Sequence, residues 1–212
     1  SAASDVYKRQ ALLATMAGFY AVYHGPEGIR TIAERIHSIA VFLEKSINRL
    51  GYKQVNAQYF DTLRFALPDT ISAQQIRTIA LSKEVNLRYF KNGDVGMSID
   101  ETTDIAAVNV LLSIFAIAAG RDWEKTSDVP MASSISAEMK RQSAYLTHEV
   151  FNKYHTETEM MRYIKRLDRK DISLAHSMIS LGSCTMKLNA AAEMLPLSRP
   201  EFMNMHLSLI HI

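Results

Sequence analysis

The sequence predicts an α+β fold in which helices pack against a small antiparallel sheet. Three observations support this fold class: apolar residues with helical spacing over residues 26–50, alternating apolar residues on both sides of a turn signal over residues 85–99, and a long apolar stretch over residues 105–119. Helices and strands that follow one another in this mixed order are typical of one packed α+β unit.

Two helices are expected at the N-terminal end of the chain. Residues 11–23 are apolar, and their helix should end before His24-Gly25-Pro26, because a residue that precedes proline avoids the helical conformation. Pro26 suits the first turn of a second helix, and Gly51 marks its end. The apolar face of the second helix is formed by residues that recur every three or four positions: Ile29, Ile32, Ile36, Ala40, Leu43, Ile47 and Leu50.

The segment after Gly51 predicts a strand followed by a short helix. Apolar and less apolar residues alternate within residues 59–67, as they do in a strand with one buried face, and Pro68 ends this pattern. Ser72 and Gln75 then form a capping box at the start of a helix.

A hairpin and a long helix complete this unit. The turn signal Lys91-Asn92-Gly93-Asp94 separates two alternating stretches, residues 85–89 and 95–99, and this arrangement predicts a hairpin. Residues 100–103 supply candidates for the N-terminal cap of a long helix that runs to Ala119. Gly120 follows as its C-terminal stop.

The regular pattern is interrupted after Gly120. Residues 121–136 contain a proline and a serine pair but no periodicity, so they predict a linker in which Trp123 is a packing anchor. Residues 137–152 are expected to form a helix. A further helix should begin at the capping box of Thr156 and Glu159. Residues 190–195 predict a last short helix, which Pro196 and Pro200 prevent from continuing.

Three histidines in this part of the chain carry no prediction of metal binding. His37 lies off the apolar face of its helix, and we expect it to be exposed to solvent. His148 and His155 have no neighbours at the spacing of metal ligands, so a surface or capping role is expected for each.

The composition excludes several classes of function. The chain has 212 residues, of which 48% are hydrophobic, and a net charge of +2, which is ordinary for a globular protein and too mild to indicate nucleic-acid binding. Its single cysteine, Cys184, excludes a disulfide framework and a cysteine zinc site. No apolar run reaches the roughly 20 residues that span a bilayer. We therefore expect no nucleic acid, membrane or metal as a partner.

Residues 176–189, His-Ser-Met-Ile-Ser-Leu-Gly-Ser-Cys-Thr-Met-Lys-Leu-Asn, are the stretch best suited to chemistry. In an extended segment alternate side chains share one face, and these side chains would be Ser183, Thr185, Lys187 and Asn189. Their hydroxyl, ammonium and amide groups suit a carboxylate or a phosphate. The alternation by itself favours a simpler interpretation, an edge strand with one polar face. Cys184 lies on the opposite, apolar face and is given no catalytic role.

This stretch closely resembles a signature of the glycine cleavage system P-protein family. Further matching strings are Ala-Gly-Phe-Tyr-Ala-Val-Tyr-His-Gly-Pro-Glu-Gly at residues 17–28, Phe-Asp-Thr-Leu at residues 60–63 and Arg-Gln-Ser-Ala-Tyr-Leu-Thr-His at residues 141–148. The resemblance covers residues 10–206. It implies three successive parts: the small C-terminal domain of a fold-type I enzyme dependent on pyridoxal phosphate (PLP) at 10–120, a linker at 121–136, and the opening segment of a second PLP-enzyme-like half at 137–206.

The two ends of the chain fall outside this resemblance. Residues 1–9 show no helical periodicity, and residues 207–212 form a short apolar tail. We interpret both as non-native additions to a truncated gene product, the alternative being natural termini. No function is expected of either end.

The resemblance implies an activity, a cofactor and partners. In the family PLP acts as the electron sink for the decarboxylation of glycine, and the aminomethyl group passes to the lipoyl arm of the H protein. The implied partners are glycine, the H protein and the rest of the P protein, which forms a homodimer in its full length. The implied substrate- or cofactor-binding residues are Ser183, Thr185, Lys187, Asn189 and His176. No catalytic residue is assigned.

The lysine that holds PLP in the family follows a histidine in a glycine-rich context, and no such string occurs in this sequence. Lys187 is not that lysine, because the family motif has a lysine at this position in addition to the PLP lysine. The 212-residue chain is therefore expected to be inactive by itself.

The resemblance also implies a compartment, the cytoplasm of a bacterium or the mitochondrion of a eukaryote, with the bacterium favoured. Two alternatives remain open. One is a non-catalytic interaction module in which residues 11–120 bind a partner helix. The other is a different fold-type I PLP enzyme, such as an aminotransferase or a lyase, because a fold alone does not determine the chemistry.

Overall fold

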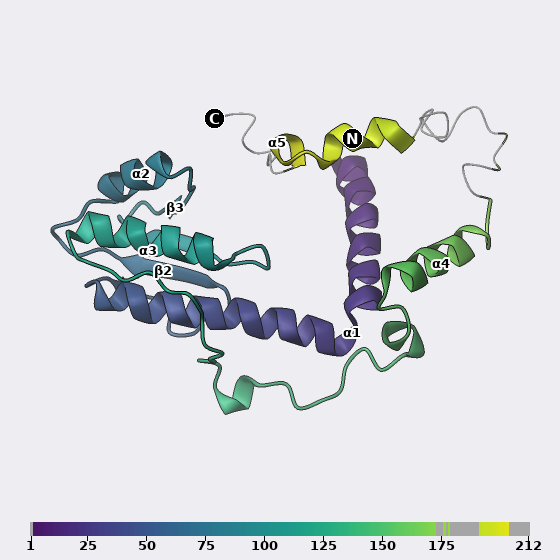
Figure 1. The fold of residues 1–212 in the computed structure, drawn as a ribbon, viewed down its shortest axis with the longest axis horizontal. Helices are drawn as coiled ribbons and strands as arrows, with labels where there is room; N and C mark the ends of the chain where they lie inside the picture. Colours follow the sequence, from purple (N-terminus) through teal and green to yellow (C-terminus); the bar gives the residue numbers. More distant parts are fainter. Residues whose placement is uncertain (1, 173–175, 177, 179–190, 204–212) are drawn as a thin grey trace. The chain divides into compact units, whose positions relative to one another are not determined.

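The computed structural model describes residues 2–172, 176, 178 and 191–203 (Figure 1). Four predictions on the site, Ser183, Thr185, Lys187 and Asn189, lie outside these residues. The chain divides into two compact units, and the boundary in the sequence falls between His155 and Thr156. The first unit has the mixed helix and antiparallel sheet that the sequence predicts.

Helix α1 (Ala2–Arg49) consists of two helical arms that meet at Gly25 (Figure 1). We call residues 2–24 the first arm and residues 26–49 the second arm. Gly25 has φ 63° and ψ −177°, a combination that is nearly restricted to glycine, and Pro26 follows it in the first turn of the second arm. The helix break before Pro26 and the stop at Gly51, where φ is 100°, are confirmed.

The first arm begins at Ala2, although residues 1–9 show no helical periodicity in the sequence. Periodicity was a poor guide there because the extension of an existing helix needs no apolar face. Each added residue gains one backbone hydrogen bond once the first turn has formed.

The sheet has four antiparallel strands in the order β1-β2-β4-β3. The central strands are β2 (Thr62–Ala66) and β4 (Val95–Ser98), which pair Leu63 with Met97 and Phe65 with Val95. Strand β3 (Arg88–Tyr89) forms the predicted hairpin with β4. Strand β1 (Lys53–Gln54) was not predicted, because two residues are too few to show alternation.

The core of the first unit lies between one face of the sheet and three helices: the second arm of α1, α2 (Ala73–Ser82) and α3 (Ile105–Ala119). Leu63 and Phe65 of β2 are fully buried there and pack with Phe115 of α3. Tyr52 closes one end of this core. Its hydroxyl donates to the Phe115 carbonyl at 2.8 Å, and burial raises the pKa of Tyr52 to about 12, so the donor remains protonated.

Local capping chemistry explains where the helices begin and end. The Ser72 hydroxyl accepts the N–H of Gln75 at the start of α2, as predicted. At α3 the N-terminal cap is Asp104 and not a residue of 100–103, because Asp100 instead bonds within its own turn to Thr102. Gly120 ends α3 with a left-handed conformation, φ 61°, as predicted.

Residues 121–136 contain no helix or strand, and they run along the first unit. Trp123 and Val129 pack against the core, so the expectation that Trp123 is a packing anchor is confirmed. The backbone N–H and carbonyl of Thr126 both bond to the side-chain amide of Asn109 in α3, at 2.9 Å each.

The prediction of a helix over residues 137–152 is wrong. Only two short 3-10 turns occur there, η1 (Ala137–Met139) and η2 (Glu149–Asn152). Residues 140–147 have no apolar face that a helix could bury, and they are without helix or strand. The His148 imidazole accepts the N–H of Val150 and so caps η2, which confirms the capping role expected of this residue.

The second unit contains α4 (Glu157–Asp168), η4 (Ala191–Ser198) and α5 (Pro200–Met203). The Thr156 hydroxyl accepts the N–H of Glu159 and donates to the Glu159 carboxylate, so the predicted cap of α4 at Thr156 is confirmed. The expected limit at Pro196 is wrong, because η4 continues through it; a proline has the φ of a helix and removes only one hydrogen bond from such a short element. Among the described residues, no helix combines the length and the apolar character that are needed to cross a bilayer.

The conformation of Gly25 leads to a prediction about stability. A Cβ atom at Gly25 would lie 2.7 Å from Cε1 of His155 and 2.8 Å from the carbonyl oxygen of Phe151. We expect Gly25→Ala to lower the free energy of unfolding by about 1–3 kcal/mol from the backbone conformation alone, with a further loss from these two contacts. Urea denaturation of the 212-residue chain measures the change.

Gly18 in the first arm is the matched control. Nothing lies within 4 Å of the place that its Cβ would take. Gly18→Ala should therefore raise the free energy of unfolding by about 0.5–1 kcal/mol, because glycine is the poorer helix former. Equal effects of the two substitutions would contradict the role that we give to Gly25.

Candidate functional site

The stretch that the sequence analysis singles out lies almost entirely outside the described residues. Ser183, Thr185, Lys187 and Asn189 are not described, so their alignment on one face stays a prediction. His176 is described, and its side chain is exposed.

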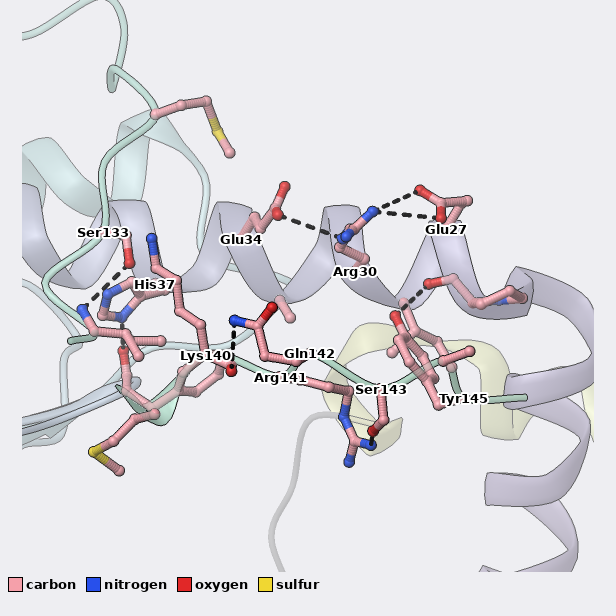
Figure 2. A pocket seen from close by; sticks show the side chains of 18 of the residues that line it. Glu27, Arg30, Glu34, His37, Ser133, Lys140, Arg141, Gln142, Ser143 and Tyr145 are labelled. Carbon is pink, nitrogen blue, oxygen red and sulfur yellow. Dashed lines mark hydrogen bonds and ion pairs between the residues drawn. The ribbon is translucent and has the colours of Figure 1, made fainter. Parts of the chain in front are cut away.

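The described part of the chain contains an open groove in the first unit (Figure 2). One wall is the second arm of α1, with Glu27, Arg30 and Glu34. The other wall is residues 131–145, which we call the strap. The groove has a volume of about 1200 Å³.

Both walls carry charges, and those on the helix are paired with one another. Arg30 lies 3.3 Å from the Glu27 carboxylate and 3.8 Å from that of Glu34 (Figure 2). Across the groove Arg141 donates to the Ser143 hydroxyl at 3.1 Å, and its guanidinium lies over the ring of Tyr145. A cation held between two carboxylates is poorly placed to bind an anion, because both carboxylates would repel it.

A buried pair of polar residues, His37 and Ser38, holds the beginning of the strap against α1. His37 Nδ1 donates to the Phe60 carbonyl at 2.8 Å, and Nε2 accepts the N–H of Ser134 at 3.0 Å. The Ser38 hydroxyl accepts the N–H of Ala132 at 3.0 Å. The imidazole is thus required in the tautomer that carries its proton on Nδ1.

The expectation that His37 is exposed to solvent is wrong, since only 2% of its surface is exposed. Its ring stacks on Phe60 with the two planes 8° apart. The apolar face of the helix was correctly predicted to be buried, and it packs on the sheet side. His37 faces the strap instead, and the sequence does not reveal where the strap lies. A signal was nevertheless present: the two polar residues lie directly before the apolar run of residues 39–43.

The far end of the strap and the turn after it are fixed at the kink of α1. The Tyr145 hydroxyl donates to the Pro26 carbonyl at 2.7 Å. Nδ1 of His155 donates to the Tyr23 carbonyl, also at 2.7 Å. Carbonyls at the end of a helical arm need partners from outside the helix, and His155 supplies one. The surface or capping role expected of His155 is therefore confirmed.

A third contact fixes the first arm from the other side. The Tyr20 hydroxyl donates to the carboxylate of Glu101, which lies in the turn before α3. This hydrogen bond is the main cause that raises the pKa of Tyr20 to about 12, with burial and the negative charge of Glu101 acting in the same direction. The hydroxyl therefore stays protonated across the physiological range and keeps donating.

The groove does not fit PLP. That cofactor requires a lysine for covalent attachment and donors that surround its phosphate. Lys140 lines the groove, but it lies exposed on the strap, while the helix wall presents two carboxylates and Arg30 is already paired. In the part of the chain that the structure describes, no three His, Cys, Asp or Glu side chains are grouped as metal ligands. We therefore assign no cofactor to the groove.

The chain is similar to known proteins along nearly its whole length. The profile of the family described as "Glycine cleavage system P-protein" matches residues 1–115. "Glycine dehydrogenase (decarboxylating)" of Bacteroides fragilis strain YCH46 is 80% identical over 205 residues, which cover 97% of this chain and 22% of the relative. The protein of the same name from Bacteroides thetaiotaomicron is 78% identical with the same coverage, and that of Flavobacterium johnsoniae is 48% identical over 97% of this chain and 21% of its own length.

Two facts follow from these comparisons. The chain spans about a fifth of the length of the curated relatives that it matches. The family match begins at residue 1, earlier than residue 10, where we expected the resemblance to start.

The contacts of His37 lead to a prediction about the strap. His37→Phe keeps the ring stacked on Phe60 but removes both hydrogen bonds, so it should lower the free energy of unfolding by about 1–3 kcal/mol. The amide of Ser134 should also exchange its hydrogen at least about tenfold faster. Hydrogen exchange with mass spectrometry measures this change, and unaltered exchange at Ser134 would contradict the anchoring role of His37.

Arg30→Gln provides the control from the same groove. Its ion pairs are more than half exposed, and exposed pairs contribute about 0–1 kcal/mol. We expect little change in stability and none in the exchange of Ser134.

Proposed function

The chain belongs to the glycine cleavage system P-protein family, and we propose that it forms part of a PLP-dependent glycine decarboxylase. The observation that carries this proposal is the 80% identity, over 97% of the chain, to glycine dehydrogenase (decarboxylating) of Bacteroides fragilis. Identity at this level over helices, sheet and strap alike supports a common fold and a common role in the larger protein.

The proposed reaction is the decarboxylation of glycine and the transfer of its aminomethyl group to the lipoyl arm of an H protein. PLP supplies an electron sink for the carbanion that decarboxylation creates. Glycine, the H protein and the remainder of the P protein are the proposed partners, with a homodimer as the proposed assembly. The relatives named above are bacterial, which supports the bacterial cytoplasm as the compartment.

We propose the finer fold on the same basis. The helices and antiparallel sheet of residues 10–120 are suited to be the small C-terminal domain of a fold-type I PLP enzyme. Residues 121–136 would then link it to a second half that opens with residues 137–206. The strap overlaps the proposed linker, which is consistent with a joint between the two halves.

The proposed substrate- and cofactor-binding side chains are those of the signature stretch: Ser183, Thr185, Lys187, Asn189 and His176. Lys187 is the cation suited to the glycine carboxylate or to the cofactor phosphate, and the hydroxyl and amide groups add neutral donors. The groove is poorly suited to compete for PLP, because Arg30 is paired with two carboxylates and Lys140 and Arg141 lie exposed on the strap.

Of the alternatives, an aminotransferase or another lyase loses support, because the relatives named above are all called glycine dehydrogenase. We do not propose an interaction module without catalysis, because the relatives named above carry the name of an enzyme.

One prediction concerns the cofactor. The 212-residue chain with equimolar PLP should show no absorbance band of a lysine-linked cofactor and no adduct after borohydride reduction, because its sequence lacks the histidine-lysine string of the family. The full-length relative from Bacteroides fragilis is the positive control. A stoichiometric PLP adduct on one lysine of this chain would refute the expectation.

A second prediction concerns Lys187. The experiment uses the full-length Bacteroides fragilis relative in which this chain replaces the 205 matching residues. Lys187→Ala should lower kcat/KM for glycine by about tenfold to a hundredfold, because a hydrogen bond to a charged group contributes about 1.5–3 kcal/mol. Circular dichroism and thermal unfolding should be unchanged.

Cys184→Ala in the same chimaeric protein is the control, since this side chain is predicted to lie on the opposite face of the same segment. It should leave the kinetics unaltered. If Lys187→Ala has normal kinetics too, the signature stretch does not bind substrate or cofactor.

A further inference from the structure

The first arm of α1 exposes a row of large apolar side chains, which we call the arm stripe. Its members recur at intervals of three, four and three residues, so they lie on one face of the helix. They are Leu13, Met16, Tyr20 and Tyr23, with 62%, 59%, 38% and 37% of their surface exposed. A different face of the arm carries Val22, which is buried in the first unit.

The chemistry of the arm is that of a helix in a protein interior. Residues 11–23 contain no charged side chain, although 22% of the whole chain is charged. A helix that is apolar all round is normally buried, and a helix on a protein surface carries a charged face. Residues 11–23 of the arm therefore lack the charged face that is typical of a helix in water.

The arm stripe is also held in a fixed direction relative to the second arm. Tyr20 is bonded to Glu101, the Tyr23 carbonyl is bonded to His155, and Gly25 sets the angle between the arms. Because contacts from two sides hold the arm, it cannot turn back to cover its own stripe.

We propose that the arm stripe is a permanent docking surface for the part of the P-protein polypeptide that lies outside these 212 residues. The relatives are more than four times as long as this chain, and the family match includes the arm. This proposal rests on the proposed function, because it takes the chain to be part of such a longer polypeptide. The occupant is an apolar surface of the remaining polypeptide.

The absence of charged side chains from residues 11–23 favours this occupant over a transient protein partner. Interfaces that form and dissociate have polar rims, and charges around them guide association. Permanent interfaces resemble a domain core, as the arm does. The H protein, as a separate protein, is therefore a poor candidate for the arm stripe.

Hydrogen exchange tests the proposal directly. The amides of residues 11–23 should exchange at least about tenfold more slowly in the full-length chimaeric protein than in the 212-residue chain, because docking suppresses the local opening of the helix. The double variant Leu13→Glu with Met16→Glu should remove this added protection in the full-length protein. In the 212-residue chain the same variant should leave stability and exchange unaltered.

Leu81→Glu is the matched control. Leu81 is 53% exposed, but its helix α2 carries Arg77 and is followed by Lys83, as expected of a surface helix. This substitution should change the exchange of residues 11–23 in neither protein.

Three results would overturn the proposal. They are equal exchange of residues 11–23 in the two proteins, an equal effect of the double variant on both, and a dimer of the 212-residue chain that the double variant dissociates. The last result would assign the arm stripe to a second copy. These measurements do not depend on catalysis, so a failure of Lys187→Ala to alter turnover would refute the binding site and leave the docking surface in place.

Discussion

The backbone conformation of Gly25 is the constraint on which the arrangement of the first unit depends. α1 bends at Gly25, whose φ and ψ values are rarely adopted by a residue with a side chain. The missing Cβ leaves room for His155 and the Phe151 carbonyl. That close approach allows His155 to bond to the Tyr23 carbonyl, while Tyr145 bonds to the carbonyl of Pro26. The direction of the first arm, the course of the strap and the groove between strap and helix therefore have a common origin.

The sequence predicted the structure correctly wherever interactions between neighbouring residues in the chain determine it. The break before Pro26, the caps at Ser72 and Thr156 and the stop at Gly120 each depend on a few adjacent residues, and all four are confirmed. The predictions failed where contacts with a segment distant in the sequence determine burial or conformation. His37 is buried because the strap covers it, and residues 140–147 lie along α1 because Tyr145 reaches a carbonyl 119 positions earlier in the chain.

The candidate site, too, could be predicted only in part from the sequence. Residues 176–189 were singled out from their pattern and their resemblance, yet four of the five proposed binding residues lie outside the described part of the chain. The groove could not be predicted, since its two walls are about 100 residues apart in sequence. Its paired Arg30 and its open wall make it poorly suited to PLP, and the proposal of anion binding by the signature stretch stays a prediction.

The bond between Tyr23 and His155 has a consequence for the order in which the protein acquires its shape. These two residues are 132 positions apart, so the ribosome synthesises the first arm long before His155, the residue that bonds to the Tyr23 carbonyl. Closing a loop of this length costs more conformational entropy than any hairpin in the sheet. The helices and sheet of residues 26–120 can thus assemble first, and the kink acquires its bond to the turn only after that core exists.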